Sequence, residues 1–123
     1  MRKMDSNMTK LRISFQGAWN VLRVGKGVVK VLGEPEYICL RVNAAMDTLV
    51  IRPCGPGDKL SFKVPLDFMG KTERIFRIFS KQFVRSFLEQ NHLNPDITYS
   101  VDGEYSETDH AVFFDMTKAV EAK

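Results

Sequence analysis

The chain has 123 residues, of which 44% are hydrophobic, and it carries a formal net charge of +3. That length supports one ordinary core and is too short for two independent large domains. The sequence contains no apolar run long enough for a membrane span or an export signal, so we expect a soluble cytoplasmic protein without a membrane partner. Cys39 and Cys54 belong to no CxxC or Cys/His cluster, which predicts reduced thiols and no metal site.

Charge is distributed unevenly along the chain. Residues 1–33 carry seven Lys or Arg against one Asp, residues 34–95 carry nine against seven acidic residues, and residues 96–123 carry two against seven. A basic segment attracts polyanions, because Lys and Arg contacts to phosphates supply most non-specific nucleic-acid affinity. The alternative is that the acidic end neutralises the basic end within the fold or across a dimer.

The first half of the chain is predicted to be rich in strands. Residues 1–9 have little apolar content and are expected to form a disordered arm. Apolar and polar residues alternate over residues 11–15 and again over residues 19–24, which predicts two strands. The β-branched run at residues 28–32 leaves helix and strand both open. Residues 37–42 and 48–52 flank a polar turn and predict a hairpin with Ile38, Leu40 and Val42 on its buried face.

The segment from Pro53 to Asp58 holds two prolines and two glycines, and we place a boundary between two small lobes there. The lobes are a basic β-rich segment over residues 10–53 and a second segment over residues 58–123. The second is expected to contain strands at residues 60–64 and 74–79, an amphipathic helix over residues 81–92 capped by Ser80, and a terminal hairpin over residues 98–116. The predicted class is α+β, mostly antiparallel strands and hairpins with one principal helix.

One stretch of the first lobe is similar to a known family. The sequence RVGKGVVKVLG from Arg23 to Gly33, the hairpin after it and LVIRP at residues 49–53 resemble the swapped-hairpin AbrB family of transition-state regulators and antitoxins. The resemblance covers residues 10–53. It implies a strand, a short helical turn ending in Leu-Gly and a hairpin, with two chains interlaced into one DNA-binding barrel. The chain departs from the family pattern at Gly25, at Val29 and at residues 34–36.

The candidate DNA-binding residues lie on the basic N-terminal segment. The resemblance carries over a basic face, and the cations on it are Arg12, Arg23, Lys26 and Lys30. If a base edge is contacted directly, arginine suits guanine, because its planar fork donates two hydrogen bonds. The alternative for each of the four is a solvated surface charge.

Other chemistry-bearing residues point to structural roles. The single tryptophan, Trp19, is expected in the core or in a dimer interface, with base stacking as the alternative. The acidic residues around His110 in the terminal hairpin offer ligands for a divalent metal, but hairpin tips are commonly acidic for solubility. The sequence has no Walker-type loop, GxGxxG motif or nucleophile turn.

We therefore predict a non-enzymatic DNA-binding or transcription-regulatory module that forms a homodimer and needs no cofactor. A competing hypothesis is a protein-interaction module without nucleic acid, in which the acidic hairpin contacts a basic partner or the basic segment of a second copy. A metal-dependent hydrolase is a distant third.

Overall fold

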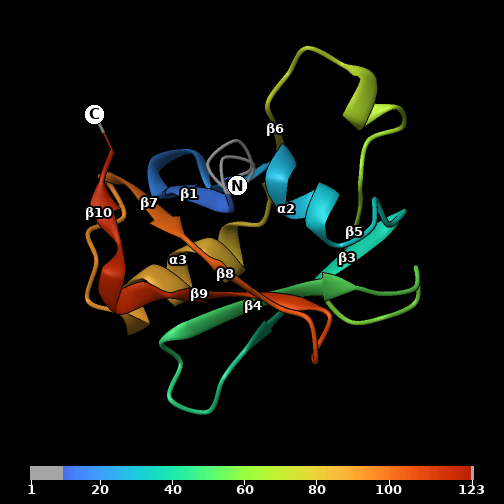
Figure 1. The fold of residues 1–123 in the computed structure, drawn as a ribbon. Coiled ribbons are helices and arrows are strands. Elements are labelled where there is room, and N and C mark those ends of the chain that lie inside the picture. Colours follow the sequence, from blue (N-terminus) through green and yellow to red (C-terminus); the bar gives the residue numbers. More distant parts are fainter. Residues whose placement is uncertain (1–9, 123) are drawn as a thin grey trace, which may run out of the picture.

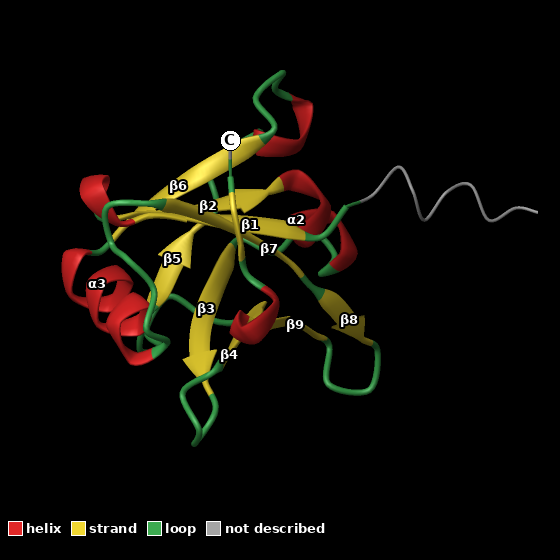
Figure 2. Ribbon diagram, turned by 90° about the vertical axis from the view of Figure 1, so that its left-hand side faces the viewer, coloured by secondary structure: helices red, strands yellow, loops and turns green. Residues whose placement is uncertain are grey.

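The computed structural model describes residues 10–122, and the arm expected over residues 1–9 lies outside them. Two five-stranded antiparallel sheets make up most of the fold, with one principal helix, so the predicted α+β class is confirmed. Figure 2 shows one sheet across the top of the molecule, the other sheet below it and the principal helix at one side. Within the described part, no helix has the length and apolar content to cross a membrane.

Sheet A has the strand order β10-β7-β1-β2-β6. Its strands are β1 Arg12–Gln16, β2 Val21–Gly25, β6 Ile75–Phe79, β7 Thr98–Asp102 and β10 Val120–Glu121. Sheet B has the order β5-β3-β4-β9-β8. Its strands are β3 Tyr37–Val42, β4 Thr48–Pro53, β5 Ser61–Lys63, β8 Glu104–Ser106 and β9 Ala111–Asp115. The helices are α2 Lys26–Val31 and α3 Lys81–Gln90, with short 3-10 turns η1 Gly17–Trp19, η2 Phe68–Gly70 and η3 Met116–Lys118.

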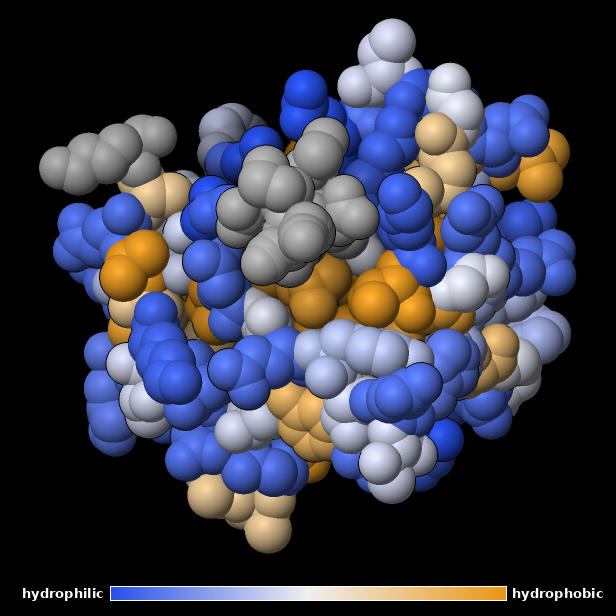
Figure 3. Space-filling model, in the orientation of Figure 1, coloured by the Kyte–Doolittle hydropathy of each residue, from blue (hydrophilic) through white to orange (hydrophobic). Residues whose placement is uncertain are grey.

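One hydrophobic core lies between the two sheets. Sheet A contributes buried residues such as Phe15, sheet B contributes residues such as Leu40 and Phe114, and α3 adds Phe87. The Phe15 and Phe87 rings pack with their centroids 5.8 Å apart. In the orientation of Figure 1, most of the surface is hydrophilic and apolar residues gather near its centre (Figure 3). Apolar burial therefore joins the sheets and the main helix into a single packed unit.

The two segments expected as lobes share both sheets. Strand β2 pairs with β6 (Figure 2), and β4 pairs with β9 (Figure 1), so each pairing joins residues 10–53 to residues 58–123. The predicted boundary at residues 53–58 is a turn closed by Gly55 and Asp58, and it joins two strands that both pair with β3. The segment at residues 53–58 is a turn and not a domain boundary, because the strands before and after it belong to the same sheets.

Residues 28–32, for which the sequence left helix and strand both open, belong to helix α2 up to Val31. Val28 and Val29 bury one side of α2 against the core, and Gly33 follows the helix with φ +86°. A positive φ strains every residue except glycine, so Gly33 provides the turn into the next segment. The strand at residues 11–15, the hairpin of β3 and β4, and the Ser80 cap of α3 are confirmed.

Two sequence expectations are corrected. The second strand begins at Val21, and Trp19 lies on η1 with 72% of its surface exposed, so the expected core position of Trp19 is wrong. The 3-10 turn interrupts the alternation and turns Gly17 inward instead. The hairpin expected over residues 98–116 divides: β7 pairs with β1 in sheet A, while β8 pairs with β9 in sheet B. Gly103 lies between β7 and β8, and a Cβ added there would overlap the Phe114 ring.

Candidate nucleic-acid interface

The outer face of sheet A carries a row of polar side chains. Ile13 and Phe15 on β1 are buried in the core, so the alternation of the strand places Ser14 on the opposite face. The register sets Ser14 opposite Arg23 on β2, and Arg23 opposite Arg77 on β6. Two arginines therefore lie directly opposite each other on neighbouring strands.

A hollow of about 1030 Å³ opens on this face, and we call it the basic hollow. Its lining comes from β1, β2 and β7, from α2, from the loop before β6 and from β10. Among the described residues, six cations line it against one carboxylate, Glu121; the cations are Lys10, Arg12, Arg23, Lys26, Lys30 and Arg74. The structure thus brings together all four residues that the sequence singled out.

Arg12 is the cation of this set with a carboxylate partner. Its Nε donates to Oδ1 of Asp102 at 2.7 Å and its Nη2 to Oδ2 at 3.3 Å, and both side chains are half exposed. The hydrogen bond and the opposite charge raise the pKa of Arg12, and the bond from Arg12 lowers the pKa of Asp102. The acidic end of the chain therefore neutralises this one position in part.

Arg23 has no carboxylate partner in the part of the chain that the structure describes. Among residues 10–122, the pair of Arg12 with Asp102 is the one ion pair within 4.0 Å, so neither Arg23 nor Arg77 contacts a carboxylate. The Nε of Arg23 is buried and donates no hydrogen bond within the described residues. Two arginine charges directly opposite each other repel, and an anion bound on the open face would relieve that repulsion.

The two lysines on α2 differ in their freedom. Nζ of Lys26 donates to the carbonyl of Lys71 and lies 5.5 Å from the centroid of the Phe68 ring, so this side chain also ties α2 to the loop before β6. Lys30 is exposed and makes no side-chain hydrogen bond within residues 10–122. Lys30 is therefore the freer of the two for a ligand.

Sequence reasoning missed three cations of this face: Lys10, Arg74 and Arg77. Lys10 and Arg74 line the basic hollow, and Arg77 extends the arginine row beyond it. The arginines lie more than 50 positions after Arg23, and only the pairing of β2 with β6 brings them beside it. The alternating strand pattern at residues 74–79 was visible in the sequence, but its pairing partner was not.

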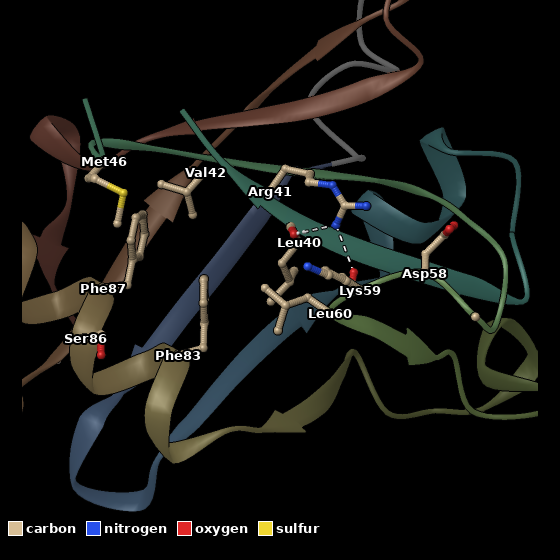
Figure 4. Close-up of a pocket in the computed structure, with 11 residues that line it drawn as sticks. Leu40, Arg41, Val42, Met46, Asp58, Lys59, Leu60, Phe83, Ser86 and Phe87 are labelled. Atoms are coloured by element: carbon tan, nitrogen blue, oxygen red, sulfur yellow. Dashed lines mark hydrogen bonds between the residues drawn. The ribbon is translucent and has the colours of Figure 1, made fainter. Parts of the chain in front are cut away.

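A second cavity, of about 630 Å³, lies between β3 and α3, and we call it the apolar groove. Phe83 and Phe87 of α3 point into it with stacked rings 5.4 Å apart, and Met46 and Leu60 stand at its borders (Figure 4). Arg41 closes the end of the β3–β5 pairing by donating from Nη1 to the carbonyls of Leu40 and Lys59.

The remaining chemistry-bearing groups are engaged locally. Among residues 10–122, no three His, Cys, Asp or Glu side chains lie close enough to hold a metal ion. In the acidic hairpin, Asp109 accepts from the Ser106 hydroxyl and His110 shares a hydrogen bond with Tyr105. The free Cys54 has its pKa raised to about 12, mainly because burial disfavours the thiolate and further because of a hydrogen bond with Cys39.

Comparisons with protein-family models, with curated proteins and with solved structures find no match for this chain.

Proposed function

We propose that this protein is a non-enzymatic DNA-binding module that contacts phosphates with the outer face of sheet A. The observation that supports this most directly is the placement of Arg23 opposite Arg77, with no carboxylate within 4.0 Å of either among the described residues. Like charges directly opposite each other destabilise a sheet. Their placement on an accessible face is therefore best explained by an anion that binds between them.

The shape and charge of the basic hollow favour a polyanion over a single small anion. Cations reach the hollow from four separate parts of the chain: the start of β1, the centre of β2, α2 and the loop before β6. Within residues 10–122, Glu121 is the one carboxylate in the lining. Several cations on one face can contact several phosphates of a nucleic-acid backbone at once.

The resemblance of residues 10–53 to the AbrB family supports a role in transcription regulation. In that family two chains interlace, whereas here β2 and β4 find their partners β6 and β9 within the same chain. The homodimer that we propose would therefore associate through exposed surfaces without exchanging these strands. Cys39 and Cys54 are both free thiols, as is usual in a reducing compartment. We therefore propose that the protein acts in the cytoplasm.

The test is the salt dependence of binding to a fluorescently labelled DNA duplex. The double variant Arg23→Gln/Arg77→Gln removes two phosphate contacts, so the slope of log K against log salt should become shallower by roughly 1.8, at about 0.9 per contact. The matched control, Arg52→Gln/Lys63→Gln, removes two exposed charges from sheet B and should leave the slope nearly unchanged.

Fluorescence anisotropy measures the affinities, and thermal unfolding checks that both variants fold. The proposal fails if the wild-type protein does not bind DNA at low salt. It also fails if both double variants lower the affinity equally, because the effect would then be one of net charge and would not belong to this face.

The apolar groove favours a second candidate function, the protein-interaction module. Met46 and Leu60 are 37% and 44% exposed at its borders, and both have positive φ angles that strain bulky side chains. A groove of this size and lining suits an apolar side chain of a partner. A hydrophobic dye such as ANS should bind there, and Leu60→Asp should abolish its fluorescence enhancement.

A further inference from the structure

Two exposed aromatic side chains lie at one end of sheet A. Trp19 is 72% exposed and Phe79 is 69% exposed. The residues that follow them are joined, because the Ser80 amide donates to the Asn20 carbonyl at 3.0 Å. Aromatic rings left in water forgo the large stabilisation that burial gives them, so a pair at one place requires an explanation.

The turn that carries Trp19 is held in place on several sides. Asn20 adopts a left-handed conformation with φ 57°, its amide donates to the Gly17 carbonyl at 3.1 Å, and its Oδ1 accepts from Nε of Arg85 at 3.1 Å. Gly17 is buried against the backbone of Pro95. The exposure of Trp19 is therefore set by a well-anchored turn.

Phe79 belongs to the same face as the arginine row. Ile75, Arg77 and Phe79 alternate with the buried residues Phe76 and Ile78, so all three lie on the outer face of β6. Ile75 lines the basic hollow, and Phe79 stands at the opposite end of the strand. At about 3.3 Å per residue, the face runs for roughly 13 Å from the hollow past Arg77 to Phe79.

We infer that Trp19 and Phe79 form a stacking platform for unpaired bases, so that the preferred nucleic acid of this face is single-stranded. This inference rests on the proposed function, since the arginines must hold the backbone while the bases reach the rings. In a duplex the bases stack on one another and present only their edges, which leaves an exposed ring without a partner. An unpaired base offers its π-face, and aromatic side chains beside a basic track bind single strands in this way.

Trp19 is the only tryptophan, so the intrinsic fluorescence of the protein reports this position directly. The probes are a short oligothymidine, an abasic oligonucleotide of equal length and charge, and a duplex of equal length. Oligothymidine should quench the fluorescence and the abasic strand should not. Phe79→Ala should weaken oligothymidine binding by roughly 5- to 150-fold, which is the range for losing one base–aromatic stack, and should change abasic binding by less than about twofold.

The matched control is Leu66→Ala, which removes a side chain 74% exposed on the loop before η2. It should leave oligothymidine binding unchanged. The inference is overturned if Phe79→Ala binds oligothymidine as tightly as wild type, or if the abasic strand quenches Trp19 equally. In both cases DNA binding by the arginines would still stand.

Loss of all nucleic-acid binding at low salt would instead overturn the proposed function and this inference together. Sedimentation velocity tests the alternative that Trp19 and Phe79 contact a second copy of the chain. If Phe79→Ala converts a dimer to a monomer while oligothymidine binding is retained, the aromatic pair is a contact between copies and the stacking role is refuted.

Discussion

Replacing Gly17 by alanine tests how tightly the turn beneath Trp19 is packed. An added Cβ would lie 2.7 Å from Cα and 2.8 Å from the carbonyl carbon of Pro95, and nearer still to the carbonyl oxygen. Backbone atoms on both sides cannot swing away as a flexible side chain would. We expect the overlap to cost about 2 to 3 kcal/mol, the upper part of the range for overpacking.

That cost translates into a measurable shift of Tm. An unfolding entropy of about 2.1 cal/mol/K per residue gives about 0.26 kcal/mol/K for 123 residues. Gly17→Ala should therefore lower Tm by roughly 8 to 12 °C in differential scanning calorimetry.

Two other glycines separate steric overlap from backbone strain. Gly57 has open space around it and no positive φ, so Gly57→Ala should change stability by less than about 0.5 kcal/mol or stabilise slightly. Gly33 also has open space but a φ of +86°, so Gly33→Ala should cost about 1 kcal/mol from conformation alone. If Gly17→Ala unfolds within 2 °C of wild type, the packing of the turn against Pro95 is not as described.

Two further predictions concern Asp102 and Cys54. Asp102→Asn should strengthen duplex binding about two- to fivefold in anisotropy titrations, because it releases Arg12 from a half-exposed pair worth about 0.5–1 kcal/mol. The fold lowers the pKa of Asp102 below its ordinary value of 3.8, so the pair with Arg12 stabilises the wild type only where Asp102 is ionised. Any stability advantage of wild type over this variant should therefore be present above pH 3.8. In denaturant titrations it should vanish as the pH falls through the lowered pKa. Iodoacetamide should alkylate Cys54 much more slowly than a free thiol at pH 8, as followed by mass spectrometry, because its pKa is raised to about 12; labelling at the rate of free cysteine would contradict that shift.

Local features were predictable because they depend on neighbours in the sequence. The alternation around Ile13 sets the buried face of β1, the polar turn after Val42 sets the β3–β4 hairpin, and the Ser80 hydroxyl caps α3 by accepting from the amide of Phe83 at 3.4 Å. The helical period of α3 likewise identified Phe87 as a core residue. Each of these signals spans fewer than about 20 residues.

The core position expected for Trp19 is wrong for a physical reason, while the expected dimer-interface position stays a prediction. Alternation suggested a strand from residue 19, but residues 17–19 form a 3-10 turn in which Gly17 lies against the Pro95 backbone and Trp19 is exposed. The contact between Gly17 and Pro95 could not be predicted from the residues around Trp19, because Pro95 lies far along the chain in the loop after α3. The division of residues 98–116 between two sheets has the same origin, since β7 pairs with the distant strand β1.

The sequence by itself determined most of the strands, the main helix and the surplus of positive charge in the first third of the chain, because these follow from side-chain pattern and composition. Only the tertiary structure decided that the two halves share one core, that Arg23 faces Arg77, and that Arg74 joins the hollow. Strand partners are chosen by the burial of apolar faces across the whole chain. Residues far apart in sequence therefore become neighbours for reasons that no local pattern contains.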